Sequence, residues 1–307
     1  MQIAPPVHVR VPGSTSNLGP GFDLVGLALS LGTEVEVRGL AAGGAHELTA
    51  AEGEAALWPR DATNLVFRAF DAALAACGGD RAAYAFTARS ELPLERGLGS
   101  SGAAIAAGLL LGAALGRRID PSALLAIGVE LEGHPDNVAA SLFGGCTLCL
   151  PRADGAPLLA RHDVHADVGV ALAWSDVRVP TAAARRALPE HVAHRAAVDN
   201  ARRLAILLEG LRTGRGDWIA AGLVDELHVP YRLPLIPGGE DALAAARAAG
   251  AWGATVSGSG SALLALGPHG RMDAAADAMA AALARHAHGA TGRVVEIVRD
   301  PPHVRRF

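Results

Sequence analysis

The residues best suited to chemistry form a glycine- and serine-rich turn that runs directly into an apolar helix. Residues 96–115 read RGLGSSGAAIAAGLLLGAAL. The first backbone N–H groups of a helix have no partner within the helix, and the helix dipole favours an anion at that end. Glycine lets the backbone approach phosphate oxygens closely, and Ser100 and Ser101 add hydroxyl groups that can bind phosphate or a metal. The segment is therefore either a phosphate-binding loop or a tight turn before a packed helix.

The absence of lysine excludes several classes of phosphate-binding protein. All 27 basic residues of the chain are arginine. A P-loop of the common type, a pyridoxal Schiff-base enzyme and a protein kinase each need a lysine. Gly97, Gly99 and Gly102 match the dinucleotide pattern G-x-G-x-x-G. A Pro/Arg break precedes them, and no matching acidic residue ends the next strand, which disfavours a dinucleotide-binding fold.

Composition indicates a chain with an ample core and no strongly charged surface. The chain has 307 residues, of which 50% are hydrophobic, and a net charge of −4. The sequence has no block of basic residues that would indicate a nucleic-acid or membrane partner. The three cysteines cannot all pair, so a reducing cytoplasm fits best, and the N-terminus does not resemble a signal peptide. Cys146 and Cys149 form C-x-x-C within an apolar strand, where packing is favoured over a redox or zinc role.

The elements that must position the glycine loop mix strands and helices without regular alternation, which favours an α+β fold. The patterns predict strands at residues 7–11, 33–38, 84–89, 144–150, 168–174, 262–266 and 292–298. They predict helices at residues 64–77, 102–115, 121–131, 182–188, 195–211, 241–249 and 273–287, with Asp120 capping the third of these. Residues 12–23 are predicted as a loop, and residues 39–53 as a loop or a hairpin. A turn cluster near 152–157 predicts two domains, 1–155 and 156–307.

Five segments, in order along the chain, resemble the motifs of the GHMP kinase superfamily and, within it, of the homoserine kinases. They are residues 9–29 (VRVPGSTSNLGPGFDLVGLAL), 93–104 (PLERGLGSSGAA), 132–145 (EGHPDNVAASLFGG), 227–238 (LHVPYRLPLIPG) and 253–266 (GATVSGSGSALLAL). The resemblance implies a two-domain fold, with a ribosomal-protein-S5-domain-2-like N-terminal domain and a ferredoxin-like C-terminal domain. It also implies ATP-dependent phosphorylation of the side-chain hydroxyl of L-homoserine in threonine biosynthesis. Ser16, Gly102 and Ser261 depart from the residues common in the family, each by a change between small residues.

The resemblance implies that ATP binds on the glycine loop with Mg²⁺. The residues expected to bind ATP are Asn64, Pro93, Leu94, Glu95, Arg96, Gly97, Leu98, Gly99, Ser100, Ser101, Gly102 and Ala103. Ser101 and Glu130 are expected to hold Mg²⁺, which prefers hard oxygen ligands and keeps several waters. Glu132 lies two residues from Glu130 on the same helix, so only one of them faces the site, and we assign Glu130. Asn64 is either an adenine contact or a helix cap.

The expected acceptor is a small zwitterion, which needs an anion for its ammonium group and a cation for its carboxylate. Asn17 and Asp23 can meet the ammonium and hydroxyl groups. Arg185 and Arg232 can bind the carboxylate in a bidentate manner, and only the resemblance selects these two arginines. Thr181 shares a helix face with Arg185, and the turn at residues 257–260 is expected near the substrate or phosphate.

The segment HPDN supplies His134, Asp136 and Asn137, which we also expect to contact the substrate. In sugar and mevalonate kinases of the superfamily an aspartate acts as base, and Asn137 occupies the corresponding place here. An asparagine cannot take a proton at neutral pH. We therefore predict a catalytic set of Ser101, Glu130 and Asn137 in which the γ-phosphate itself receives the proton.

Two other functions stay open at this point. One keeps the ATP site but uses another acceptor, such as threonine or another small amino or sugar alcohol. The other is a non-catalytic nucleotide- or amino-acid-binding regulator, which the presence of Ser101, Glu130 and Asn137 disfavours. The resemblance also makes a homodimer a candidate assembly, although no segment locates an interface.

Overall fold

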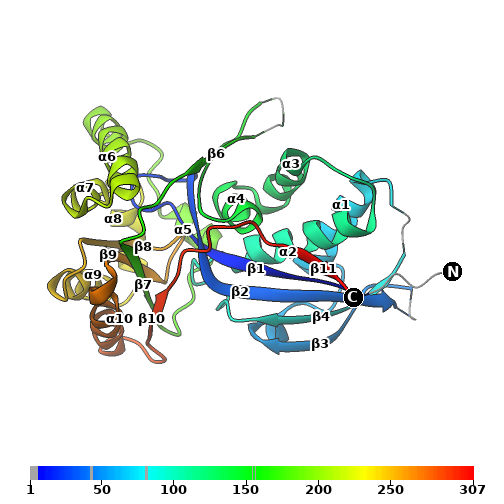
Figure 1. Cartoon of the computed structure of the whole chain (residues 1–307). Helices are drawn as coiled ribbons and strands as arrows, with labels where there is room; N and C mark the ends of the chain where they lie inside the picture. Colours follow the sequence, from blue (N-terminus) through cyan, green and yellow to red (C-terminus); the bar gives the residue numbers. More distant parts are fainter. Residues whose placement is uncertain (1–5, 42–43, 80–81, 154, 156) are drawn as a thin grey trace.

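Two β-sheets organise the molecule (Figure 1). The computed structural model describes residues 6–41, 44–79, 82–153, 155 and 157–307. The seven-stranded sheet contains β1 (Val7–Ser16), β2 (Val25–Leu40), β3 (Glu47–Gly53), β4 (Tyr84–Ser90), β5 (Cys146–Leu150), β6 (Leu158–His162) and β11 (Val304–Arg306). The four-stranded sheet contains β7 (Val168–Trp174), β8 (Gly253–Val256), β9 (Leu263–Pro268) and β10 (Thr291–Val295).

The first sheet runs β11-β1-β2-β4-β3, and β5 pairs with β2 and β6 with β5. Its pairs are antiparallel except for β3 with β4. The first sheet is accompanied by a short 3-10 helix η1 (Glu54–Leu57) and by α1 (Leu65–Ala76), α2 (Ser100–Leu115), α3 (Pro121–Glu132) and α4 (Asp136–Phe143). Asp120 caps α3 through the Ser122 amide at 2.7 Å, with Pro121 in the first turn, as the sequence predicted.

The small residues of α2 let α1 lie against it closely. A Cβ atom at Gly108 would lie 2.4 Å from the Val66 carbonyl oxygen, and one at Gly112 would lie 2.4 Å from the Phe70 oxygen. Both contacts are shorter than any side chain tolerates, so the two backbones meet only where glycine stands. The apolar, alanine-rich sequence of α2 therefore belongs to a helix that is buried in the core. Its N-terminal end begins directly after the glycine loop.

The second sheet has the strand order β10-β7-β9-β8, all antiparallel. Helices precede β8, and α10 (His269–Ala284) lies between β9 and β10, which is the ferredoxin-like arrangement that the resemblance implied. The helices before β8 are α5 (Thr181–Arg186), α6 (His194–Thr213), α7 (Gly216–Gly222), α8 (Val229–Arg232), η2 (Leu233–Leu235) and α9 (Gly239–Ala248). The expected α+β class and two-domain fold are confirmed.

The predicted loop at residues 12–23 and the predicted loop or hairpin at residues 39–53 are partly wrong. Strand β1 continues through Ser16, because its pairing with β2 shifts register at Pro12 and Gly13 rather than ending there. A bulge tolerates proline, which cannot donate to the ladder. Residues 47–53 form the edge strand β3, whose many exposed residues hide the strand pattern. The sequence also missed α4, α7 and the short strands β6, β8 and β11.

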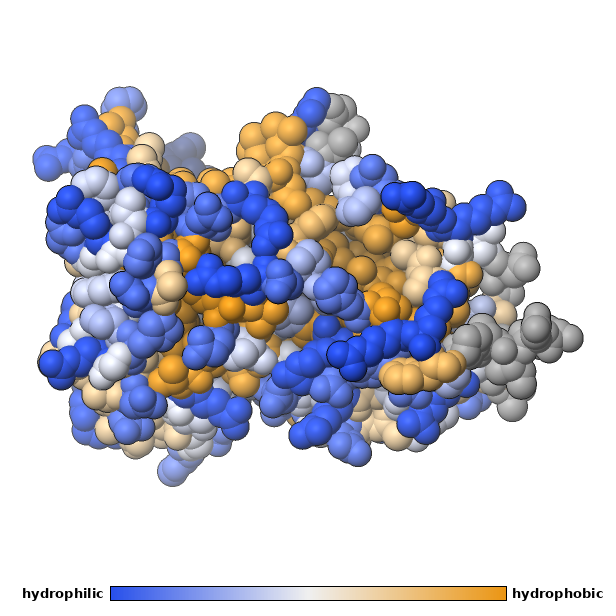
Figure 2. Space-filling view, in the orientation of Figure 1, coloured by the Kyte–Doolittle hydropathy of each residue, from blue (hydrophilic) through white to orange (hydrophobic). Residues whose placement is uncertain are grey.

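Sheet membership does not follow a division of the chain at residue 155. Strand β6 pairs with β5, and the C-terminal strand β11 returns to pair with β1, so both belong to the first sheet. The domain division at 155/156 stays a prediction. Figure 2 shows apolar residues at the β5–β6 hairpin, where Leu150 and Leu158 are each more than half exposed, and across the middle of the face, between polar areas.

Cys146 and Cys149 are buried among the apolar residues of the core, in agreement with the predicted packing role. All three cysteines are free thiols with buried side chains. Burial raises the pKa of Cys146 to about 12 and that of Cys149 to about 11, so neither is a thiolate near neutral pH.

Within the described residues, no cluster of histidine, cysteine, aspartate and glutamate has a geometry that would hold a metal by itself. No helix in the same part of the chain is long and apolar enough to span a membrane.

Candidate active site

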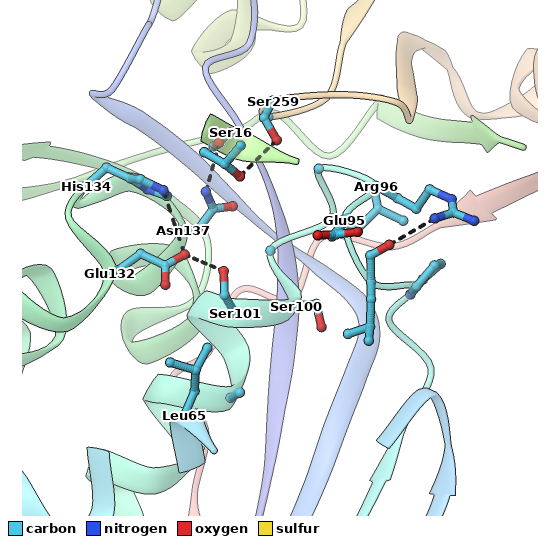
Figure 3. Close-up of a pocket in the computed structure, with 18 of the residues that line it drawn as sticks. Ser16, Leu65, Glu95, Arg96, Ser100, Ser101, Glu132, His134, Asn137 and Ser259 are labelled. Atoms are coloured by element: carbon cyan, nitrogen blue, oxygen red, sulfur yellow. Dashed lines mark hydrogen bonds and ion pairs between the residues drawn. The ribbon is translucent and has the colours of Figure 1, made fainter. Parts of the chain in front are cut away.

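A pocket of about 450 Å³ lies where the N-terminal loop, the glycine loop, the α3–α4 turn and the second half of the chain meet (Figure 3). It brings together most of the residues that the sequence selected. These are Asn17, Asp23, Asn64, Pro93, Leu94, Glu95, Arg96, Gly97, Leu98, Gly99, Ser100, Ser101, His134, Asp136, Asn137, Arg185 and Arg232. Glu130, Gly102 and Ala103 do not line it.

The glycine loop has the conformation that a phosphate cradle needs. Gly97 and Gly99 adopt φ values of +73° and +68°, in the left-handed region that favours glycine. Gly99 is the N-cap of α2, and no side chain of the described residues caps that helix. The first N–H groups of α2 are thus free to meet an anion at the pocket wall.

Gly102 and Ala103 are buried in α2 rather than exposed to the pocket. A Cβ atom at Gly102 would lie 2.9 Å from the Asn137 Cβ. The small residue is needed because α2 crosses the start of α4 there. The small size of Gly102 allows the loop and Asn137 to lie together, and contact of Gly102 and Ala103 with ATP stays a prediction.

Arg96 lines the pocket, but its guanidinium group is used to hold the loop. It donates from Nε to the Ser175 carbonyl oxygen at 2.7 Å and from Nη2 to that of Asp176 at 2.8 Å. Nη1 donates to the Leu94 oxygen at 3.0 Å. Burial, followed by the positive charge of Arg178, lowers the pKa of Arg96. Its side chain thus ties the glycine loop to the second half of the chain.

Glu132, not Glu130, faces the glycine loop. Its Oε1 accepts a hydrogen bond of 2.5 Å from Ser101 Oγ, and its side chain is only 6% exposed. Glu130 lies two residues earlier on α3 and is exposed to solvent. The assignment of Glu130 to the site is therefore corrected. Burial raises the pKa of Glu132, against the opposing effects of His134 and of the Ser101 hydrogen bond.

Asn137 is held by a buried network of hydrogen bonds. Its Oδ1 accepts from Ser14 Oγ at 2.9 Å, and its Nδ2 donates to Ser16 Oγ at 3.1 Å and to Asp136 Oδ1 at 3.0 Å. Asp136 Oδ1 also accepts from the Asn137 backbone at 2.7 Å. Ser16, which departs from the family pattern, therefore supplies an acceptor that alanine lacks, and Ser14 is a positioning residue that the sequence analysis missed.

His134 lies between two carboxylates. Its Nδ1 is 3.1 Å from Asp136 Oδ1, and its Nε2 is 3.8 Å from Glu132 Oε1. Burial by itself lowers the pKa of His134. The hydrogen bond and charge of Asp136, with the charge of Glu132, outweigh burial and raise the pKa above its ordinary value.

This raised pKa predicts a pH-dependent contribution to stability. The contribution is fully present below the unfolded-state pKa of about 6.5 and is lost as the pH rises through the higher folded-state value. We expect the free energy of unfolding lost in His134→Gln to be larger at about pH 5.5 than at about pH 8.5, measured by urea unfolding. An equal loss at both pH values would show that His134 does not gain its proton on folding.

Asp23 and Arg185 form a bidentate ion pair across the pocket. Arg185 Nη1 donates to Asp23 Oδ2 at 2.9 Å and Nη2 to Oδ1 at 2.8 Å, which raises the pKa of Arg185. Asn17 Oδ1 accepts from the Asp23 backbone at 2.9 Å, and Asn17 Nδ2 donates to the Gly258 oxygen at 2.9 Å. Asn17 and Asp23 both have positive φ, at 70° and 52°, so the loop is built to present them.

Arg232 is a buried cation at the same end of the pocket. Its residue is 2% exposed, and burial, followed by the positive charge of Arg185, lowers its pKa to about 10. Nη1 donates to the Gly258 oxygen at 2.9 Å, and Nε has no hydrogen-bond partner among the described residues. The described residues also give it no ion pair, so its charge is available to an anion.

Asn64 caps α1, as one of its two predicted roles requires. Its Oδ1 accepts from the Val66 amide at 2.9 Å, and its Nδ2 donates to the Pro59 oxygen at 2.7 Å. Contact with adenine stays a prediction. Trp58, Arg178, Thr181 and Ser259 also line the pocket. The sequence had signalled Thr181 by its helix face and Ser259 by its turn, but it carried no signal for Trp58 or Arg178.

Comparison with known proteins agrees with this architecture. Residues 64–145 match the model of the GHMP kinases N terminal domain, and residues 207–285 match that of GHMP kinases C terminal. A homoserine kinase of Synechococcus sp. (strain RCC307) is 41% identical over 280 residues, which cover 91% of this chain and 89% of that protein. The chain belongs to the GHMP kinase family.

Two further relatives that span most of the chain are also homoserine kinases. One from Nostoc sp. (strain PCC 7120) is 38% identical over 95% of this chain and 100% of that protein. The crystal structure of homoserine kinase from Cytophaga hutchinsonii superposes with a TM-score of 0.88 at 28% identity, covering 99% of each chain. Mevalonate kinase from L. major, at 15% identity and a TM-score of 0.69, shares the fold.

Proposed function

We propose that this chain transfers the γ-phosphate of ATP to the side-chain hydroxyl of L-homoserine, forming O-phospho-L-homoserine. The observation that carries the proposal is that one pocket holds a phosphate-type loop beside Asp23, Arg185 and Arg232. The relatives named homoserine kinase support this choice of acceptor.

The nucleotide site must neutralise phosphate charge without lysine. Backbone N–H groups of the glycine loop and the dipole of α2 face the place where phosphates would lie. Arg178 is exposed and lines the pocket beside the same loop. The next residue, Val179, connects this segment to the loop, because its amide donates to the Glu95 carbonyl oxygen at 3.1 Å. Phosphoryl transfer depends mainly on such positioning and charge stabilisation.

Ser101 and Glu132 have the type and the number of oxygen ligands that a magnesium ion needs from a protein. They place one hydroxyl and one buried carboxylate side by side at the N-terminus of α2. Mg²⁺ binds through one or two carboxylates while phosphate oxygens and water complete its shell, so two protein ligands are sufficient. When bound there, the ion would supply positive charge to the phosphate oxygens.

The other end of the pocket matches an α-amino acid. Asp23 would accept the ammonium group, and Arg185 and Arg232 would donate to the carboxylate. Binding of the zwitterion would thus replace the Asp23–Arg185 ion pair by two ion pairs between protein and substrate. It would add no net charge to the site. Asn17 and the HPDN residues His134, Asp136 and Asn137 would orient the hydroxyl toward the glycine loop.

The proposed mechanism uses no side-chain base. Asn137 cannot take a proton, and Oδ1 of Asp136 already accepts from Asn137. The proton of the attacking hydroxyl therefore passes to the transferred phosphoryl group. We expect Asp136→Asn to keep kcat within about tenfold of wild type, because an amide oxygen still accepts these bonds. Loss of turnover by about 1000-fold in a folded variant would instead identify Asp136 as a general base.

The test of the proposed function is release of ADP from Mg-ATP with L-homoserine, L-threonine, L-serine, mevalonate or galactose. Release that depends strongly on L-homoserine supports the proposal. Release with another acceptor would keep the ATP site and overturn Asp23, Arg185 and Arg232 as homoserine ligands. ATP binding without release would favour a regulator.

A cytoplasmic location and a homodimer stay predictions, and light scattering measures the oligomeric state.

A further inference from the structure

The guanidinium group of Arg232 has one side-chain hydrogen-bond partner among the described residues, the imidazole of His228. His228 is 0% exposed and directly precedes α8, which carries Arg232. Its Nδ1 is 3.3 Å from Arg232 Nη1. The only other hydrogen bond of the guanidinium group among the described residues is Nη1 to the Gly258 oxygen. The orientation of this buried cation is therefore set by one imidazole and one backbone carbonyl group, both at Nη1.

The tautomer of His228 follows from its second contact. Nε2 lies 2.8 Å from the Gly19 carbonyl oxygen. A carbonyl oxygen can only accept, so Nε2 carries the proton and Nδ1 presents a lone pair to Arg232. Burial, together with the charge of Arg232, lowers the pKa of His228 and outweighs the opposite effects of Asp225, Gly19 and Asp23. The imidazole is thus neutral and is able to accept from the guanidinium group.

The surroundings of His228 are built to hold this ring. Asp225 accepts from the backbone amides of His228 at 2.8 Å and Val229 at 2.7 Å, so its carboxylate fixes the start of α8. The Phe22 ring lies 5.1 Å from the His228 ring, and the Arg232 guanidinium lies 5.0 Å from the same Phe22 ring. His228 therefore joins Arg232 to the loop of residues 17–23, which carries Asp23.

We propose that His228 is a positioning residue that holds Arg232 for the carboxylate of the acceptor. Its Nε2–H is anchored on Gly19, and its Nδ1 lone pair fixes Arg232 Nη1, which leaves the unpartnered part of the guanidinium for the substrate. This inference rests on the proposed function, because it concerns how Arg232 is held to recognise the carboxylate that distinguishes an amino acid from an amino alcohol.

Two substitutions separate the two contacts of the ring. In His228→Gln, the longer amide can still donate to Gly19 but leaves no acceptor beside Arg232. In His228→Asn, the shorter amide places an oxygen near the position of Nδ1 and loses Gly19. A matched control is His46→Gln, since His46 is also largely buried and hydrogen-bonded, to Asp71 at 2.9 Å and to the Tyr84 amide at 3.0 Å.

The readout is the ratio of kcat/KM for L-homoserine to that for 3-aminopropan-1-ol, which lacks only the carboxylate. We expect this ratio to fall about tenfold in His228→Gln and to stay within about threefold of wild type in His228→Asn and His46→Gln. The KM for ATP should not change. Equal loss with both acceptors, or an equal fall of the ratio in both His228 variants, would overturn the inference.

Failure of the proposed function gives a different result. If wild type shows no homoserine-dependent ADP release, or no preference for L-homoserine, the assignment of Arg232 fails and the inference with it. If wild type has the preference and His228→Gln keeps it, only the inference fails. Nitrogen-15 NMR of the wild-type ring decides the case if His228→Gln does not fold: an Nε2-protonated neutral ring supports the inference, and an Nδ1-protonated ring overturns it.

Discussion

Glu132→Gln lowers kcat at least about 100-fold, whereas Glu130→Gln leaves it within about twofold of wild type. Both glutamates lie on α3, but only Glu132 meets Ser101 at the N-terminus of α2. Glutamine keeps the size of the side chain and can still contact the serine hydroxyl. The variant therefore removes the negative charge that would hold Mg²⁺ beside the phosphates, and little else.

The measurement is ADP release at saturating ATP and L-homoserine over a series of Mg²⁺ concentrations. In Glu132→Gln we expect the half-saturating Mg²⁺ concentration to rise, because a ligand has been lost. Glu130→Gln serves as the matched control, since it makes the same chemical change on the exposed face of the helix. Equal effects of the two substitutions, or a lower kcat with unchanged Mg²⁺ dependence, would contradict the metal-binding role of Glu132.

Asp23→Asn and Arg185→Gln each raise the KM for L-homoserine about 10- to 100-fold and leave the KM for ATP unchanged. The two side chains pair with each other at 2.8 and 2.9 Å in the described structure. Neutralising either one leaves its partner with an unmatched charge and removes one contact to the zwitterion. Both side chains are about one-third exposed, so solvent screening limits the effect.

A double-mutant cycle tests this arrangement. Because the two residues form one pair, the double variant should lose less than the product of the single losses. Arg186→Gln is the control, since Arg186 follows Arg185 on α5, is exposed and does not line the pocket. Strictly multiplicative losses, or a rise in the KM for ATP of similar size, would show that the pair does not act as one acceptor site.

Local sequence patterns determined the parts of the site that depend on backbone conformation and chain-local contacts. Gly97 and Gly99 allow the left-handed turns of the loop, Asp120 and Pro121 begin α3, and Asn64 caps α1. Each of these features is set within a few residues of the chain, by the absence of a Cβ atom or by a side chain reaching the next turn. The motif order also predicted the family and most of the pocket.

Tertiary packing decided what each side chain faces. Helical spacing shows that Glu130 and Glu132 point in different directions, but only the packing of α3 beside α2 determines which one meets Ser101. From the sequence, Arg96 was expected to bind ATP. In the structure its guanidinium group donates instead to the carbonyl oxygens of residues 175 and 176. His228 gained its role from Gly19, which lies 209 positions earlier in the chain. Strand β11 joins β1 across almost the whole sequence. Such partners are selected by long-range burial and hydrogen bonding, which no local pattern of residues contains.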